Sequence, residues 1–222
     1  MIVEMMLAGF LFLFLIIMNL AGEGFGTSVE QTLSDLDSDA KLQKINKDPK
    51  KFKISILLAL IDHVSVISIA VLLFLAFSPV NIILGITWVF FRAGEGLVQI
   101  YNKKNYWGLL SVARQYSGTS GAEKNALIDL GRSILKTKNF SWTFSQVLFS
   151  IGTLAYSILF ATYGVVPAII GWFGIVASIA FGFGSGIILA KPNFKVLLQL
   201  GGLLVLLFEI VLGGWLLFSP LI

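Results

Sequence analysis

Six long runs of apolar residues set the limits on what this chain can fold into. A helix needs about 20 apolar residues to cross about 30 Å of bilayer hydrocarbon, because it rises about 1.5 Å per residue. The six runs cover residues 2–20, 54–77, 80–101, 141–163, 165–189 and 196–217. Only helices and closed barrels satisfy every backbone polar group in lipid, and runs of this length indicate helices. We therefore expect an all-α fold, a polytopic bundle of six transmembrane helices in a single membrane domain over residues 1–222.

The composition agrees with a chain whose main solvent is lipid. Of the 222 residues, 57% are hydrophobic and 13% are charged, whereas soluble domains carry about 25% charged residues. The net charge of +4 does not indicate nucleic-acid binding, because the basic residues flank the apolar runs, as orientation signals do. The expected partner is the lipid bilayer. Cysteine is absent, which excludes disulfides and thiolate metal sites.

Local signals place the ends of the expected spans. The first run contains Glu4 and no Lys or Arg before it, which favours a retained helix over a cleaved signal peptide with its basic start. Breaks between later spans are expected at Ser78-Pro79, Tyr163-Gly164 and Lys191-Pro192-Asn193, because Pro and Gly end helices.

Two polar loops interrupt the series of spans. Residues 21–53 follow the first span, and residues 102–140 follow the third. Each holds a pair with the spacing of a capping box, Thr27 with Glu30 and Ser120 with Glu123. Apolar residues then recur at helical intervals, at Val29, Leu33 and Leu36 in the first loop and at Leu127, Leu130 and Ile134 in the second. We expect a short amphipathic helix in each loop. For the second loop, a solvated connector is an equal alternative.

The basic residues are unevenly divided between the two membrane surfaces. With six spans, the segments 21–53, 102–140 and 190–195 share one surface and carry six, seven and two Lys or Arg, while the opposite surface has none. The positive-inside rule makes these three segments cytoplasmic and both termini external.

Several short motifs give the chain a resemblance to a known family. They are Ala8-Gly9 in the first span, Phe91-Arg92-Ala93-Gly94-Glu95 in the third, and Tyr163 with Pro167 and Gly171-Trp172-Phe173-Gly174 at the fifth. Together they resemble the prokaryotic family of six-span membrane proteins catalogued as domain of unknown function 4386. The resemblance covers nearly the whole chain and implies an architecture and a prokaryotic cytoplasmic membrane, without an activity. Members of that family look as though they carry basic residues before the first span, where this chain has none, and that pattern implies an internal N-terminus.

Ionisable residues inside the spans are the candidates for a binding site or a proton relay, because each costs about 2.5 to 3.5 kcal/mol to insert. Arg92, Glu95 and Gln99 share one helix face, and Asp62 and His63 lie in the preceding span. At about 1.5 Å per residue, Asp62 and Arg92 lie about 12 and 13 Å from the basic surface, and Gln146 about 8 Å. Glu4 and Glu209 lie deeper, at about 24 and 20 Å, and are expected outside the cluster.

Two interpretations of this cluster remain open. It is either a functional site, which binds a lipid headgroup or a small anionic ligand or relays protons, or a structural lock between the second and third spans. In both we expect Asp62 to form an ion pair with Arg92, with Glu95 as the second acceptor. No metal or catalytic site is predicted, because His63 is the only histidine and no nucleophile stands at a recognisable spacing from a base.

Small residues recur every four positions in the fifth span, at Gly174, Ser178, Gly182 and Gly186. Such a stripe lets another helix approach closely. We expect it to pack helices within the chain, with homodimerisation as the alternative.

These features favour a non-catalytic membrane scaffold or a protein that binds a small molecule or lipid, and no cofactor is indicated. The alternatives are a transporter of protons or small solutes and an intramembrane enzyme that modifies lipid. The buried charges support transport, and the lack of an internal repeat weakens it.

Overall fold

A computed structural model of the chain describes residues 1–24, 37–191 and 196–219. The described residues form seven helices, and no strand is found among them. In chain order the helices are α1 (Ile2–Gly24), α2 (Ser38–Lys47), α3 (Pro49–Phe77), α4 (Ile82–Tyr116), α5 (Gly121–Tyr163), α6 (Ala168–Ala190) and α7 (Val196–Phe218). Six of them, all except α2, are long and apolar enough to cross a membrane. The predicted all-α polytopic bundle is therefore confirmed.

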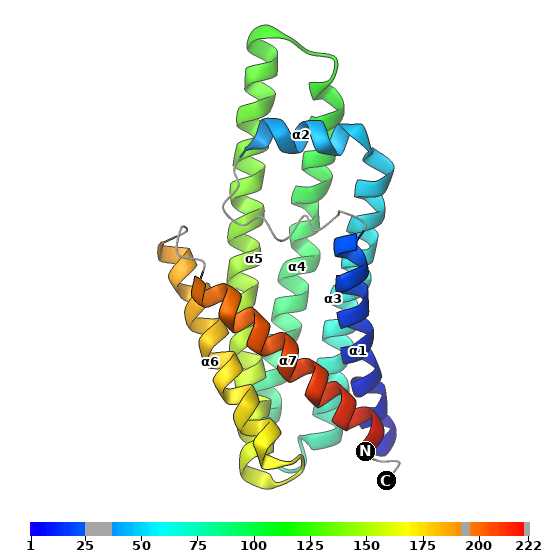
Figure 1. Ribbon diagram of the computed structural model, residues 1–222, viewed down its shortest axis with the longest axis vertical. Coiled ribbons are helices and arrows are strands. Elements are labelled where there is room, and N and C mark those ends of the chain that lie inside the picture. The colour runs from blue at the N-terminus through cyan, green and yellow to red at the C-terminus, as the bar shows by residue number, and fades with distance from the viewer. Residues whose placement is uncertain (25–36, 192–195, 220–222) are drawn as a thin grey trace.

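The six long helices form a closed ring. Following the contacts between neighbours, the order is α1, α3, α4, α5, α6, α7 and then α1 again. Among the described helices, none packs its backbone against a helix on the opposite side of this ring. Both termini lie at one end of the molecule and α2 lies at the other (Figure 1). We call these the terminal end and the basic end, because the polar segments with the Lys and Arg residues belong to the second.

Side-chain caps and turn residues fix the helix boundaries near the expected breaks. Asp48 caps α3 by accepting a hydrogen bond from the Lys51 backbone at 2.9 Å, with Pro49 in the first turn. Asn81 caps α4 in the same way through the backbone N–H of Leu84, at 3.0 Å. Gly164 ends α5 with φ at +68°, a left-handed conformation that suits glycine.

The largest difference from expectation lies in residues 102–140. This segment is helical, as predicted, but its helix is not a separate short one. It instead lengthens the flanking spans, so that α4 has 35 residues and α5 has 43. Helices of this length extend about 52 and 65 Å, far beyond the hydrocarbon thickness of about 30 Å. Ser120 does precede the first residue of α5, as its capping-box spacing suggested, although its side chain makes no capping bond.

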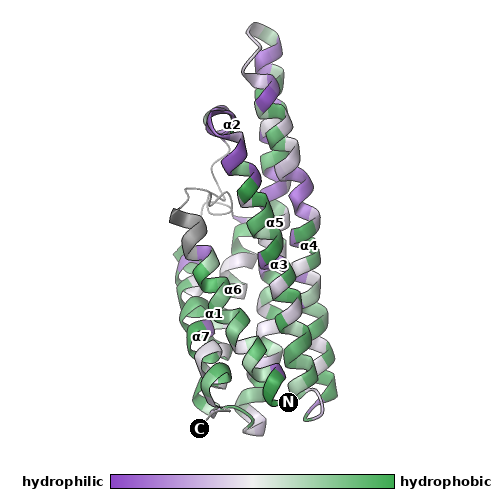
Figure 2. Ribbon diagram, turned by 90° about the vertical axis from the view of Figure 1, so that its right-hand side faces the viewer, coloured by the Kyte–Doolittle hydropathy of each residue, from purple (hydrophilic) through white to green (hydrophobic). Residues whose placement is uncertain are grey.

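The projecting part of α4 and α5 is an antiparallel helical hairpin with its own hydrophobic core. Its apolar side chains meet those of α2, which crosses the hairpin (Figure 1), and of the first turns of α3. Leu42 of α2, Leu109 of α4 and Leu135 of α5 are completely buried there. Figure 2 shows hydrophilic residues concentrated at this end, on α2 and the hairpin, while the ring is mainly hydrophobic. The amphipathic helix expected after Thr27 lies outside the described residues; α2 begins further along, at Ser38.

Aromatic side chains fill the ring interior toward the terminal end. Tyr156 of α5 stacks on Phe208 of α7 with 6.1 Å between ring centroids, and Phe173 of α6 meets Phe208 edge-on. Phe77 of α3 meets Phe160 of α5 in the same way. We call these five residues the aromatic layer. Because they come from four helices, they hold the ring together where no backbone contact crosses it.

The small-residue stripe of α6 is packed at one end and open at the other. A Cβ at Gly174 would lie 2.3 Å from the Ser157 hydroxyl, and Ser178 is buried, whereas a Cβ at Gly186 would meet nothing. Gly182 is intermediate, with the Ser150 side chain 3.0 Å from its Cβ position. The open part belongs to an apolar groove of about 480 Å³ between α5 and α6.

Candidate functional site

Helix α4 carries a stripe of buried polar residues along its inner face. Arg92, Glu95, Gln99 and Asn102 follow one another at helical spacing, and each is at most 8% exposed. They begin beside the aromatic layer and continue toward the basic end. We call these four residues the polar column. Water cannot satisfy them inside the ring, so each must find its partners in the protein.

Arg92 and Glu95 form a buried ion pair. The guanidinium donates to the Glu95 carboxylate at 2.6 Å, and it also lies over the Phe149 ring at 4.3 Å from the centroid. Gly152 of α5 provides the room, because a Cβ there would lie only 2.6 Å from Cγ of Arg92. The arginine is thus held by its ion pair with Glu95 and by its contact with the Phe149 ring, in a space that the absence of a side chain at Gly152 leaves open.

Above this pair, uncharged side chains continue the column toward the basic end. The Gln99 amide donates to the Ser145 hydroxyl at 2.6 Å, and Asn102 donates to the backbone carbonyl of Lys138 at 3.1 Å. Asn105 then donates to Asn102 at 2.8 Å, where the chain of hydrogen bonds leaves the fully buried interior. These contacts join α4 to α5 across the level where the ring meets the projecting hairpin.

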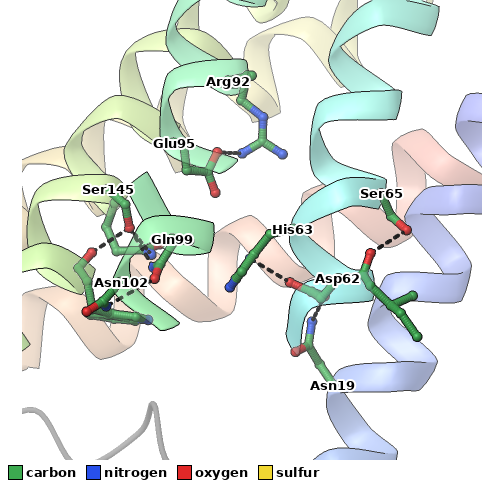
Figure 3. A network of polar contacts seen from close by, with 12 residues as sticks. Asn19, Asp62, His63, Ser65, Arg92, Glu95, Gln99, Asn102 and Ser145 are labelled. Carbon is green, nitrogen blue, oxygen red and sulfur yellow. Dashed lines mark hydrogen bonds and ion pairs between the residues drawn. The ribbon is translucent and has the colours of Figure 1, made fainter. Parts of the chain in front are cut away.

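The expected ion pair between Asp62 and Arg92 is not formed. Asp62 contacts the neighbouring His63 ring at 3.3 Å and accepts a hydrogen bond from Asn19 of α1, also at 3.3 Å (Figure 3). Asp62 points toward α1, whereas Arg92 lies against Phe149 and Gly152 of α5. Glu95, expected as the second acceptor of the arginine, is its ion-pair partner.

His63 occupies the space between these two groups. It is 6% exposed and points from α3 toward the residues of α4 (Figure 3). It is close enough to interact electrostatically with Glu95, while its Nδ1 atom faces Asp62. His63 therefore lies between the carboxylate on the α1 side of the ring and the buried pair on α4.

Gln146 has a smaller part in the cluster than expected. It is only partly buried, and its amide contacts the Ser145 hydroxyl at 3.3 Å. Ser145 is the α5 residue that bonds Gln99. The two residues are adjacent, so they point about 100° apart on the helix, and sequence depth alone could not choose between them.

Two residues outside the predicted cluster lie near Arg92. One was expected to lie elsewhere, and the other was not predicted as a site residue. Glu209 of α7 and Tyr156 of α5 are both within electrostatic range of the guanidinium. The depth estimated for Glu209 by counting residues is too large, because α7 runs obliquely across the bundle (Figure 1). A tilted helix descends less than 1.5 Å per residue along the membrane normal. Only the tilt, which the sequence does not encode locally, could have identified Glu209.

Carboxyl groups outnumber guanidinium groups near Arg92. Three carboxylates, those of Glu95, Asp62 and Glu209, interact with this one arginine. His63 is the remaining titratable neighbour of Glu95 among these elements. Among the described residues, no group of three His, Cys, Asp or Glu has the arrangement of a metal site. The arrangement therefore suits a proton, or a ligand that brings a positive charge.

Comparison with known protein families places the chain in one of them. The model of the family described as Domain of unknown function (DUF4386) matches residues 7–219, which is nearly the whole chain. No curated protein and no solved structure matches the chain.

Proposed function

The chain belongs to the DUF4386 family, and within that family of membrane proteins we propose that it is a non-catalytic protein that binds a small polar ligand inside its helix ring. The ligand site is the polar column together with Asp62, His63 and Glu209. The ligand is a molecule that carries an ammonium group, either a soluble amine or a lipid headgroup.

The observation that carries this proposal is the position of the polar column. It joins the basic end to Arg92 and Glu95 in the ring interior and meets the aromatic layer beyond them. Ionisable groups in a membrane interior are costly and are retained mainly where they have a role. A simple lock between two helices needs one ion pair, whereas this interior collects polar residues from α3, α4, α5 and α7.

The sign of the ligand's charge follows from the three carboxyl groups around one arginine. A small anion, which the sequence alone suggested, would add a fourth negative charge to this region. An ammonium group would instead interact favourably with Glu95, Asp62 or Glu209. The same excess favours a second candidate function, a proton-coupled carrier in which one of these carboxylates exchanges its proton as the ligand binds.

Native mass spectrometry of the full-length protein from mild detergent tests the proposal. We expect the protein to retain an amine or an amine-bearing lipid, and we expect Glu209→Gln and Asp62→Asn to reduce the retained fraction. Glu123→Gln, an equal charge change on the exposed hairpin, is the matched control. Loss of the ligand in the control as well, or a protein that retains no amine-bearing molecule, would contradict the proposal.

The carrier is distinguished from a plain binding protein by its coupling to protons. Once the retained amine is identified, titration calorimetry in two buffers with different ionisation enthalpies reports protons released on binding. Release of about one proton per ligand favours the carrier, because ligand and proton then compete for one carboxylate. Binding without proton release favours the non-catalytic binding protein.

A further inference from the structure

Lysines are concentrated where α2 turns into α3. Six of the chain's sixteen basic residues occur between positions 41 and 53. Four of them, Lys44, Lys47, Lys50 and Lys51, are exposed. We call these four the lysine corner. The ligand site in the ring does not include it.

The lysine corner lies directly before the apolar part of α3, where we expect the surface of the bilayer. Apolar sequence begins at Ile54, directly after the lysines, and the Ile54 and Leu57 side chains are 56% and 54% exposed, as residues that face lipid are. Lys50 precedes Ile54 by about one helical turn, or about 6 Å. Helix α2 crosses the hairpin at this end instead of continuing in the direction of α3 (Figure 1), so its lysines remain near the same level.

Exposed aromatic residues on the neighbouring helix mark the same boundary. Tyr101 and Trp107 of α4 are 68% and 41% exposed, and aromatic side chains favour the headgroup region. The Lys104 ammonium lies 3.7 Å from the centre of the Tyr101 ring. An ammonium over an aromatic ring at this level is typical of a lysine that extends toward headgroups.

The carboxylates of the segment do not neutralise the lysine corner. Residues 37–53 contain six lysines and three aspartates. Asp37 and Asp48 cap α2 and α3 through backbone N–H groups, and Asp39 accepts from the Tyr116 hydroxyl and from Gln43. The segment thus keeps a net charge of about +3, well within the Debye length of about 8 to 10 Å from the lipid phosphates.

We propose that the lysine corner binds the headgroups of anionic phospholipids in the adjacent leaflet. Clusters of four to eight basic residues directly beside a membrane span attract anionic lipid, with a contribution from each lysine near the surface. A lipid surface is the partner that this position favours, because the bilayer always faces the corner. The interaction orients α2 and sets the depth of the start of α3.

Electron spin resonance with spin-labelled lipids tests this proposal on the full-length protein in phosphatidylcholine vesicles. We expect spin-labelled phosphatidylglycerol to associate with the wild type about threefold or more over phosphatidylcholine. The triple variant Lys47→Gln, Lys50→Gln and Lys51→Gln should lose most of this preference. The control variant removes three positive charges from the projecting hairpin, at Arg114, Lys124 and Arg132, and should retain it because those residues lie further from the phosphates.

Three outcomes of the lipid-binding measurement would overturn the proposal, and a competition experiment supplies a fourth. The three are a wild type with no preference for phosphatidylglycerol, an equal loss in the two triple variants, and a preference unchanged in 1 M NaCl, where the Debye length falls to about 3 Å. Competition by inorganic phosphate at millimolar concentration would also overturn it, since the corner would then bind a free anion. Circular dichroism of each variant verifies that the helices remain folded.

Discussion

The Arg92 environment matches the properties of a guanidinium more closely than those of an ammonium. The planar group donates to Glu95 while its face lies on the Phe149 ring, and Gly152 leaves room for the side chain. A lysine has a compact charge and cannot make both contacts at once. Arg92 is also at most 2% exposed, so water cannot replace a lost partner.

The first prediction concerns the coupling of this pair. Arg92→Gln should destabilise the protein by about 3 to 5 kcal/mol, because it leaves Glu95 buried without its partner. The double variant with Glu95→Gln should lose clearly less than the sum of the two single losses. The losses in free energy of unfolding caused by Arg92→Gln and Asp62→Asn should be closer to additive, since Asp62 contacts His63 and Asn19 instead. Denaturation in detergent measures the free energies of unfolding, and equal coupling in the two pairs would contradict the pairing described.

A second contact at this scale attaches α2 to the hairpin. The Tyr116 hydroxyl donates to Asp39, and this bond holds the pKa of the Asp39 carboxyl below its ordinary value. A carboxylate whose pKa is lower in the folded state stabilises the fold at neutral pH and loses that effect in acid, as the pH falls through the lowered pKa.

We therefore predict that α2 becomes less protected only in acid, below the ordinary aspartate pKa of about 3.9. Hydrogen exchange of the α2 amides, corrected for intrinsic rates, measures this protection at pH 7 and near pH 3. Tyr116→Phe should lower the protection at pH 7 and remove most of its dependence on pH. Tyr101→Phe, at an exposed position on the same helix, is the control; an unchanged pH profile in Tyr116→Phe would refute the role of the bond.

At the scale of the helices, close contacts between backbones determine how the ring closes. A Cβ at Gly184 of α6 would lie 2.6 Å from the backbone nitrogen of Leu198 in α7, and one at Gly201 of α7 would lie 2.6 Å from Cα of Phe181. Gly9 of α1 meets Gly213 of α7 in the same manner, with a Cβ at Gly9 only 2.6 Å from the Gly213 carbonyl. Backbone atoms cannot rotate away as side chains can, so these positions require glycine.

The third prediction compares two glycines on one helix. Gly184→Ala should destabilise the protein by about 1 to 3 kcal/mol, because α6 and α7 must separate to admit the methyl group. Gly186→Ala should be neutral or stabilising, since its Cβ meets nothing and alanine favours helix by about 1 kcal/mol over glycine. Thermal stability in detergent distinguishes the two variants. Equal losses at the two sites would show that the close approach of α6 and α7 at Gly184 does not determine stability.

A related comparison concerns the small-residue stripe itself. Gly182→Leu should be more damaging than Ile179→Phe, because the Ser150 side chain lies 3.0 Å from the Cβ position of residue 182, whereas Ile179 is 44% exposed on the lipid side. The same thermal assay applies. If both variants lose equal stability, residue 182 is not a packing position.

At the scale of the whole molecule, one end carries the charge and the other carries the termini. The hairpin, α2 and the lysine corner project from the basic end, while the turns at the terminal end contain no Lys or Arg. The positive-inside rule predicts that the basic end faces the cytoplasm.

The orientation prediction uses the absence of cysteine from the chain, which makes any introduced cysteine the only thiol. In intact cells, a membrane-impermeant maleimide should label Val80→Cys, in the turn at the terminal end, and should not label Lys41→Cys or Lys124→Cys. Permeabilised cells serve as the control and should be labelled at all three positions. Labelling of the two lysine positions in intact cells would reverse the orientation and place the N-terminus inside, as the family resemblance implied.

Local periodicity and the cost of charge in lipid were enough to predict the six spans, their order and three residues of the polar column. The fourth, Asn102, was assigned to a polar loop and was not predicted as part of the cluster. Arg92, Glu95 and Gln99 share a helix face whatever surrounds them. Polar residues 102–140 were harder to interpret, since an amphipathic segment has the same pattern whether it lies alone or continues a span. The hairpin partner and α2 settle that choice by covering its apolar stripe.

Which residues meet across the ring depends on how the helices pack against one another. The partner of Arg92 depends on the rotation of α3, which directs Asp62 toward Asn19, and the inclusion of Glu209 depends on the tilt of α7. Rotation and tilt are set by packing against neighbouring helices, including the glycine contacts between α6 and α7 and between α1 and α7. The sequence records these contacts only as scattered glycines, because their meaning lies in residues that are distant along the chain.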